Sequence, residues 1–301
     1  MSTASVDIAA RRHRPGIVAR MRRRAVGITR RSPTLAAGVL ILAYFAFLAV
    51  FHNALMPFDP VRAFPSQVLA PPSARFWFGT DGNGMDVFSR VIYGAIYAFA
   101  IAGPTVLLAL VIGVPVGLYT GLKGGWPDEI LMRLSDGLRV FPSIILALAV
   151  VAVAGPSLLN VILVIGLLDA PIFARVVRAE VLALRESNLV EAAIAVGNPT
   201  RRLLFVHLAP NAIQGAMAQT AVRAAWAVRI SATLAFLGIG IQPPTPEWGA
   251  MIRQGAEFMV TGQWWVALFP GIALIAMVLG LNLAGDGLQD LIDPRRAAAT
   301  R

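Results

Sequence analysis

Six apolar segments dominate the pattern of the chain, and shorter polar segments separate them. The apolar runs cover about 34–56, 94–120, 140–155, 157–174, 211–238 and 264–285. Most approach or exceed the ~20 residues that a helix needs to cross a bilayer. Pro104 and Pro115 fall inside the second run, which membrane helices tolerate when neighbouring groups satisfy the freed carbonyls. The pattern predicts an all-α, polytopic transmembrane bundle of six spans.

The polar segments give the chain its organisation. We predict a basic N-terminal tail, a first span, a long loop rich in proline and aromatic residues, a membrane core that contains one large polar loop, and a short C-terminal tail. In that order, the segments are 1–33, 34–56, 57–92, 93–285 with its polar loop 175–210, and 286–301.

The distribution of basic residues predicts the orientation. With the N-terminus inside, 20 of the 26 lysines and arginines lie in inner segments, four lie in outer loops, and Arg223 and Arg229 lie in the fifth span. Cytoplasmic loops of membrane proteins carry such an excess of positive charge. We therefore expect both termini, and the loop 175–210, in the cytoplasm.

Composition narrows the function classes. The chain is 57% hydrophobic and 14% charged, whereas soluble domains carry about 25% charged residues. The net charge of +10 follows the membrane topology, which favours contact with anionic lipid over a nucleic-acid partner. Cysteine is absent and the three histidines lie far apart in sequence, so we expect no metal site.

The sequence lacks the chemistry of an energy-converting or catalytic chain. A phosphate-binding P-loop needs Gly-Lys-Ser/Thr, but the single lysine, Lys123, follows Leu122. A membrane-embedded enzyme is disfavoured, because HExxH is absent and His52 is the only histidine in a predicted span. A secondary transporter or channel remains an alternative, although the chain shows no obvious internal repeat. We expect no catalytic residue and no bound cofactor.

The polar loop contains a helix pattern of its own. Asn188 and Glu191 form a variant of the capping box, so we expect a helix to begin there. Leu189, Ala192, Ala193 and Val196 recur at the spacing of one helix face, which small side chains leave open to close approach. We expect this face to dock against another protein.

Glycine and proline punctuate the rest of this loop. Gly197 is the expected end of the first helix, with a positive φ. Asn198 and Pro199 are the expected N-cap and first residue of a second helix. Pro210 marks where that helix meets the fifth span.

These residues resemble the EAA loop of binding-protein-dependent ABC importer permeases. Glu191-Ala192-Ala193, Gly197 and Pro210 have the family spacing, although Ala209 replaces the usual leucine. Two more segments resemble the dipeptide/oligopeptide/nickel subfamily, Phe78-Gly79-Thr80-Asp81 with Gly84-Met85-Asp86, and 235–249. The resemblance extends from about residue 32 to 295 and is to the second permease subunit of this type.

The resemblance implies a type I importer permease in the bacterial cytoplasmic membrane. Its implied partners are a sister permease, two ATPase subunits that bind ATP and Mg²⁺, and an extracytoplasmic binding protein. The implied cargo is a di- or oligopeptide, with nickel chelates, glutathione and opines as alternatives. The implied ATPase-coupling residues are Glu191, Ala192, Ala193, Gly197, Asn198, Pro199, His207 and Pro210.

Two further features allow alternative interpretations. Arg223 and Arg229 either pair with an acid such as Asp169 or line a translocation path for a carboxylate-bearing substrate. The outer loops 57–92 and 239–263 either receive the binding protein or pack on one another and on the sister chain. Within the first loop, we expect Asp81 and Asp86 to be turn and cap residues.

Overall fold

The structure, a computed structural model, describes residues 32–292. Almost all of the predicted basic tail and the last residues of the C-terminal tail lie outside this part of the chain. Within it, the regular elements are helices, apart from two isolated bridge pairs, Ala63 with Met85 and Thr80 with Asp86. The predicted all-α class is confirmed.

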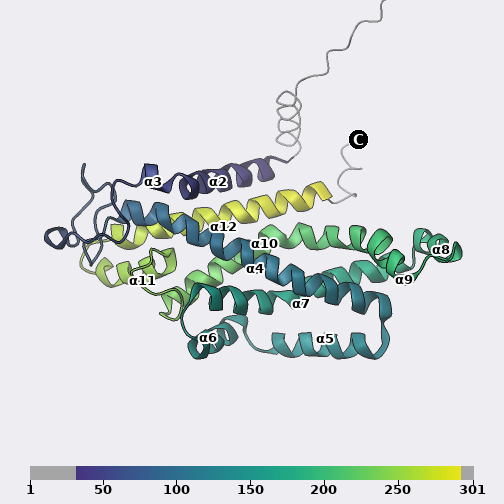
Figure 1. Cartoon of the computed structure of the whole chain (residues 1–301). Helices are drawn as coiled ribbons and strands as arrows, with labels where there is room; N and C mark the ends of the chain where they lie inside the picture. Colours follow the sequence, from purple (N-terminus) through teal and green to yellow (C-terminus); the bar gives the residue numbers. More distant parts are fainter. Residues whose placement is uncertain (1–31, 293–301) are drawn as a thin grey trace, which may run out of the picture.

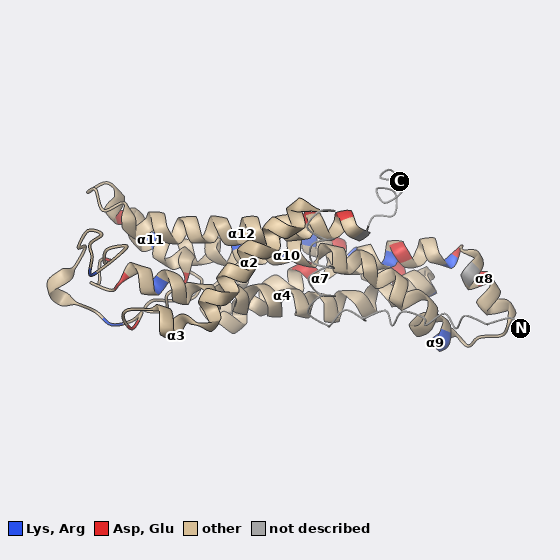
Figure 2. Cartoon of the chain, turned by 90° about the horizontal axis from the view of Figure 1, so that it is seen from above, with Lys and Arg blue, Asp and Glu red and all other residues tan. Residues whose placement is uncertain are grey.

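Four helices are long and apolar enough to cross a membrane on their own. They are α2 (Pro33–Val50), α4 (Val87–Lys123), α7 (Leu158–Arg185) and α12 (Trp265–Ile292). They lie along one another in an elongated bundle (Figure 1). In Figure 2 tan residues cover most of this bundle, with charged residues at both ends and a few between them. These helices correspond to predicted spans one, two, four and six.

The third predicted span has different bounds in the structure. Helix α6 (Ser143–Ala154) has 12 residues and is about 18 Å long, which is too short for the ~30 Å hydrocarbon core. Helix α5 (Gly125–Val140) precedes it at an angle of 87° and lies beside α7 in Figure 1. The polar stretch 121–139 is thus largely the helix α5, and the bent pair of α5 and α6 is a fifth candidate crossing by length and composition.

Helix α10 (Ala209–Phe236) corresponds to the fifth predicted span. Its 28 residues are about 42 Å long, and it packs against α4, α7, α11 and α12. It is less apolar than the four helices above, because alanine, glutamine, threonine and two arginines make up much of its sequence. A helix enclosed by other helices does not need a fully apolar surface.

Glycines allow α4 and α7 to approach closely. Gly113, Gly117 and Gly121 lie four residues apart, on one face of α4. A Cβ atom on Gly113 or Gly117 would lie 2.5 or 2.4 Å from a carbonyl oxygen of α7, and one on Gly121 would lie 2.7 Å from the Cβ of Val181. Small residues at this spacing are the usual basis of close helix packing in membranes.

Short elements cover the two ends of the bundle. Helix α3 (His52–Leu55), the 3₁₀ turn η1 (Pro65–Gln67) and helix α11 (Trp248–Met259) belong to the end that we predicted to be extracytoplasmic. Helix α8 (Asn188–Ala195), helix α9 (Thr200–Arg202) and the π-helical segment η2 (Leu203–Leu208) form the opposite end. Figure 1 shows α8 and α11 at opposite ends of the molecule.

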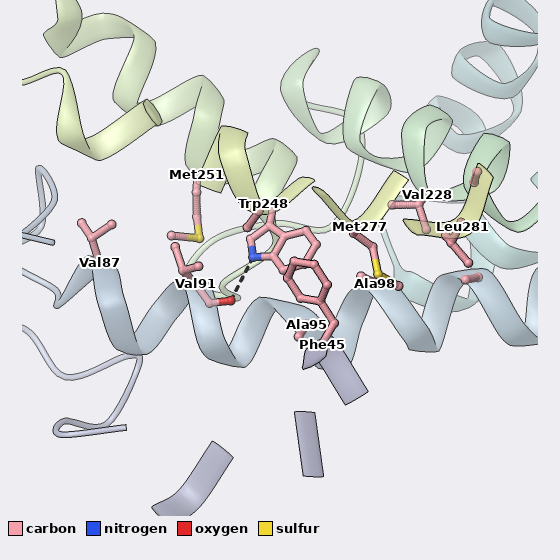
Figure 3. Packing of buried hydrophobic residues seen from close by; sticks show 13 residues of the cluster. Phe45, Val87, Val91, Ala95, Ala98, Val228, Trp248, Met251, Met277 and Leu281 are labelled. Atoms are coloured by element: carbon pink, nitrogen blue, oxygen red, sulfur yellow. Dashed lines mark hydrogen bonds between the residues drawn. The ribbon is translucent and has the colours of Figure 1, made fainter. Parts of the chain in front are cut away.

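The predicted loop 239–263 contains a helix that we did not anticipate. Glu247 caps α11 by accepting a hydrogen bond from the Ala250 amide at 2.8 Å. Trp248 and Met251, on its buried face, enter a cluster with Phe45 of α2 and residues of α4, α10 and α12 (Figure 3). The helix thus fixes the outer loop to the bundle.

Candidate coupling segment and intramembrane charge cluster

The segment between α7 and α10 is helical almost throughout. Helix α8 begins one residue earlier than its predicted cap implied, because Ser187 has the extended backbone of an N-cap and Asn188 is already helical. The predicted cap at Asn188 is therefore wrong. Both residue types are good N-caps, so the sequence does not distinguish the two positions.

Gly197 ends α8 as predicted, with φ +81°. Its amide donates to the Ile194 carbonyl at 2.8 Å, and the Asn198 amide donates to the Ala193 carbonyl at 3.1 Å, which is a Schellman motif. The Asn198 side chain donates to the same Ala193 carbonyl at 3.0 Å. Asn198 therefore closes α8, and the prediction that it caps the next helix is wrong, since Pro199 occupies that N-cap.

Only part of the predicted docking face points outward. Ala193, together with Val190, is buried against α7, η2 and α10 in one apolar cluster. Ala192 is exposed, as is Glu191. Large apolar side chains extend this outer surface, and Val196 has 84% of its surface exposed. We define the exposed surface of this end by Glu191, Ala192, Ile194, Val196, Phe205 and Val206.

The two remaining predicted coupling residues lie on the route into α10. His207 is half-buried in η2, and its carbonyl accepts a hydrogen bond from the Asn211 side chain at 2.7 Å. Pro210 is exposed in the first turn of α10. Both residues therefore follow α8 along the chain and do not belong to it.

A charged pair lies near the middle of the bundle. Asp169 of α7 and Arg223 of α10 form an ion pair, with Nη1 and Oδ1 3.3 Å apart. The Asp169 side chain is fully buried, and 22% of the Arg223 side chain is exposed. The predicted pairing of Arg223 with Asp169 is thus present in the structure. Asp169 Oδ2 and Arg223 Nε are buried without a hydrogen-bond partner among the described residues.

Two further arginines border this pair. Arg139, near the end of α5, lies within electrostatic range of the Asp169 carboxylate but forms no hydrogen bond or ion pair with it. Arg229 is six residues beyond Arg223 on α10, about 9 Å further along the helix axis. Both side chains are exposed, and neither forms an ion pair within residues 32–292. The structure does not show Arg229 paired with an acid, although pairing was one of our two expectations for it.

The outer loops pack on one another around Arg90. This side chain is 1% exposed, and its Nη1 donates to the carbonyls of Pro60 at 2.9 Å and Pro244 at 3.2 Å. Its Nε lies 3.4 Å from Oδ2 of Asp81. We had counted Arg90 as a loop residue, but it belongs to the first turn of α4 and ties both loops to that helix.

Asp81 and Asp86 have the predicted roles. Asp81 accepts hydrogen bonds from the amides of Asn83 and Met85 at 2.8 and 2.9 Å, as a turn residue does. Asp86 is the N-cap of α4 and accepts from the Ser89 amide at 2.8 Å. The outer loops therefore form a fixed structure.

Comparisons with known proteins agree with this geometry. Residues 113–298 match the family described as binding-protein-dependent transport system inner membrane component. The chain belongs to this family. The match covers the coupling segment, the charge cluster and the last two long helices, and it starts within α4.

Curated relatives cover most of the chain. A dipeptide transport system permease protein of Alkalihalophilus pseudofirmus is 40% identical over 86% of this chain and 84% of its own length. A glutathione transport system permease protein of Salmonella typhimurium is 40% identical over 88% of both chains. A di/tripeptide transport system permease protein of Pseudomonas aeruginosa is 37% identical over 86% of this chain and 87% of its own.

A solved structure supports the fold. An inward-facing form of the MetNI methionine ABC transporter matches with a TM-score of 0.54 and 22% identity, over 68% of this chain and 96% of that one. The chain therefore has the type I ABC importer permease fold, as predicted. At this identity the likeness concerns the fold alone.

Proposed function

We propose that the chain is the membrane-spanning subunit of a bacterial ABC importer for small peptides. Family membership and relatives named for dipeptides, di/tripeptides and glutathione support this cargo class. Nickel chelates and opines are the alternative cargoes within the same machinery. The chain performs no covalent chemistry, and separate ATPase subunits bind ATP and Mg²⁺ and supply the energy.

The exposed surface of α8 carries the proposal. Ile194 and Val196 are 58% and 84% exposed at the very end of the bundle, on a helix that the Schellman motif and two buried residues hold in place. An apolar surface on a fixed helix suits a groove in a partner protein. We assign this surface, together with Gly197, Asn198 and Pro199 directly after α8, to contact with an ATPase subunit.

The other partners follow from the same assignment. If α8 meets the ATPase, its end of the bundle is cytoplasmic, and the lysine and arginine excess supports that orientation. The Arg90-centred loops then face outward, where an extracytoplasmic binding protein docks. A sister permease completes the path, which we place along Asp169, Arg223 and Arg229.

Gly197→Asp tests the coupling assignment. A Cβ at Gly197 meets nothing within 4 Å, so the variant strains the backbone and adds a negative charge without a clash inside this chain. We expect it to abolish copurification of the ATPase subunits and peptide import into vesicles. Gly262→Asp is the matched control, because Gly262 also has a positive φ (+95°) and open space, but lies at the other end.

The two variants separate strain from docking. Both should insert and lose similar stability, on the order of 1 kcal/mol or more. Only Gly197→Asp should lose the ATPase subunits. Normal ATPase copurification and import by Gly197→Asp would refute the assignment of α8 as the coupling helix.

A further inference from the structure

One arginine near the middle of the bundle has no acidic partner in the described chain. Asp169 pairs with Arg223, and α12 brings Asp286 close to the same level, because Gly285 packs on Val222 of α10. Arg229, further along α10, forms no ion pair among the described residues, and α10 and α6 carry no acidic residue. Arg139 of α5 is a further guanidinium group within electrostatic range of Asp169.

The unpaired arginines lie on an accessible face. Arg229 and Thr233 are four residues apart on α10 and share a helix face, and Arg229 is exposed. Arg139 is exposed at the end of α5. Arginine in contact with lipid tails is strongly disfavoured, so intramembrane arginines face protein or a wet cavity. Each of these two arginines is thus turned toward the sister permease or the path.

The buried pair leaves polar atoms without partners. Asp169 Oδ2 and Arg223 Nε are buried, and each lacks a hydrogen-bond partner among the described residues. A buried polar atom without a partner costs stability unless water or a ligand satisfies it. These atoms remain available to water or to a polar cargo. Asp169 offsets part of the positive charge, which limits how tightly an anion is held.

We propose that Arg139, Arg223 and Arg229 form an anion-recognition surface that favours peptides with a net negative charge. The proposal rests on the function proposed above and specifies its cargo. A zwitterionic peptide has one ammonium and one carboxylate, so its net interaction with the surface is small. An acidic side chain adds a second carboxylate for a guanidinium group, whereas a basic side chain is repelled.

The test uses the complete transporter in proteoliposomes, with its binding protein. The probes are Ala-Glu, Ala-Ala and Ala-Lys, and import by each variant is divided by wild-type import of the same peptide. This ratio cancels the preference of the binding protein. Arg229→Gln and Arg139→Gln should each lower Ala-Glu import about ten-fold and change Ala-Ala import less than about three-fold. Arg229→Lys, which keeps the charge, should retain most of the Ala-Glu import.

Arg133→Gln is the matched control. Arg133 belongs to the same helix as Arg139, but it is exposed and paired with Glu129. The Arg133→Gln variant should leave the import rates of all three peptides close to those of the wild type. Equal losses for the three peptides in the arginine variants, or no change in any, would overturn the proposal.

Three other outcomes also decide the question. Loss of the sister permease from purified Arg229→Gln complexes would mean that Arg229 pairs with an acid of that subunit, which overturns anion recognition. Wild-type import of Ala-Ala without Ala-Glu overturns the charge preference and leaves the importer function intact. A wild-type complex that imports none of the peptides refutes both proposals.

Discussion

Replacing Gly117 by alanine should force α4 and α7 apart. A Cβ atom at this position would lie 2.4 Å from the Ala174 carbonyl oxygen and 2.8 Å from the Cβ of Val177. Contacts between non-bonded carbon atoms are normally ~3.5–4.0 Å. The Ala174 oxygen belongs to helix backbone and cannot rotate away, so α7 must retreat by roughly 1 Å. Such overpacking costs about 1–3 kcal/mol of unfolding free energy.

Gly137→Ala in α5 isolates this packing cost. Gly137 is exposed, and a Cβ there meets nothing within 4 Å. Both variants gain the helix propensity of alanine, which is up to ~1 kcal/mol over glycine. Their difference in unfolding free energy therefore measures the overpacking alone.

Unfolding in mixed micelles of a mild detergent and dodecyl sulfate, followed by circular dichroism, provides the measurement. We expect Gly137→Ala to be as stable as the wild type or slightly more stable. Gly117→Ala should be less stable than Gly137→Ala by about 1–3 kcal/mol. If the two variants unfold together, the close approach of α4 and α7 at Gly117 is incorrect.

Three more perturbations follow from buried polar groups. Burial raises the pKa of Glu247 to about 7 from 4.5, so the folded state holds the proton more tightly and stability falls as pH rises between these values. Glu247→Gln should remove this loss of about 3 kcal/mol in unfolding titrations from pH 4 to 8, and an unchanged slope would contradict the assignment. Arg223→Met should lower the free energy of unfolding by about 3–5 kcal/mol, because it leaves the buried Asp169 unpaired. Adding Asp169→Leu to the same chain should restore much of this stability. If the two substitutions instead lower the stability additively, the two residues are not coupled. Trp248→Phe loses the 3.0 Å bond from Nε1 to the Val91 carbonyl and should cost about 1–2 kcal/mol; equal stability would show that this bond contributes nothing.

Hydropathy located the spans but not their ends. Helix α7 continues to Arg185, 11 residues beyond its predicted end at 174. The charged residues there looked like the start of a loop. In the structure Arg178 pairs with Asp128 of α5 at 2.6 Å, and Arg175 pairs with Asp136. A partner some 40–50 residues away in sequence is invisible to local hydropathy.

Local chemistry was predictable where one residue type decides the geometry. Gly197 has a positive φ because glycine adopts it without steric cost. Asp86 caps α4 because its side chain can reach the amide three residues on. Ser187 and Asn188 are both suitable caps, and local sequence does not choose between them.

The parts of the candidate site that we missed depend on tertiary contacts. Arg90 looked like one more loop arginine, but it binds carbonyls of two loops, at Pro60 and at Pro244, and the second lies 154 residues further along the chain than Arg90. Arg139 looked like a cytoplasmic charge, yet the course of α5 brings it near Asp169. By contrast, the glycine spacing at 113, 117 and 121 was visible in the sequence and would have predicted the α4–α7 contact.

Helix α7 joins the two candidate sites mechanically. One face packs on α4 through the glycines, Asp169 contacts α10, and its C-terminal end leads into α8 within three residues. About 24 Å of continuous helix separate Asp169 from Arg185. The apolar cluster that holds Val190 of α8 also includes residues of α4, α7 and α10. If an ATPase displaces α8, these helices must move largely together, so the Asp169–Arg223 region moves with α8 rather than independently of it.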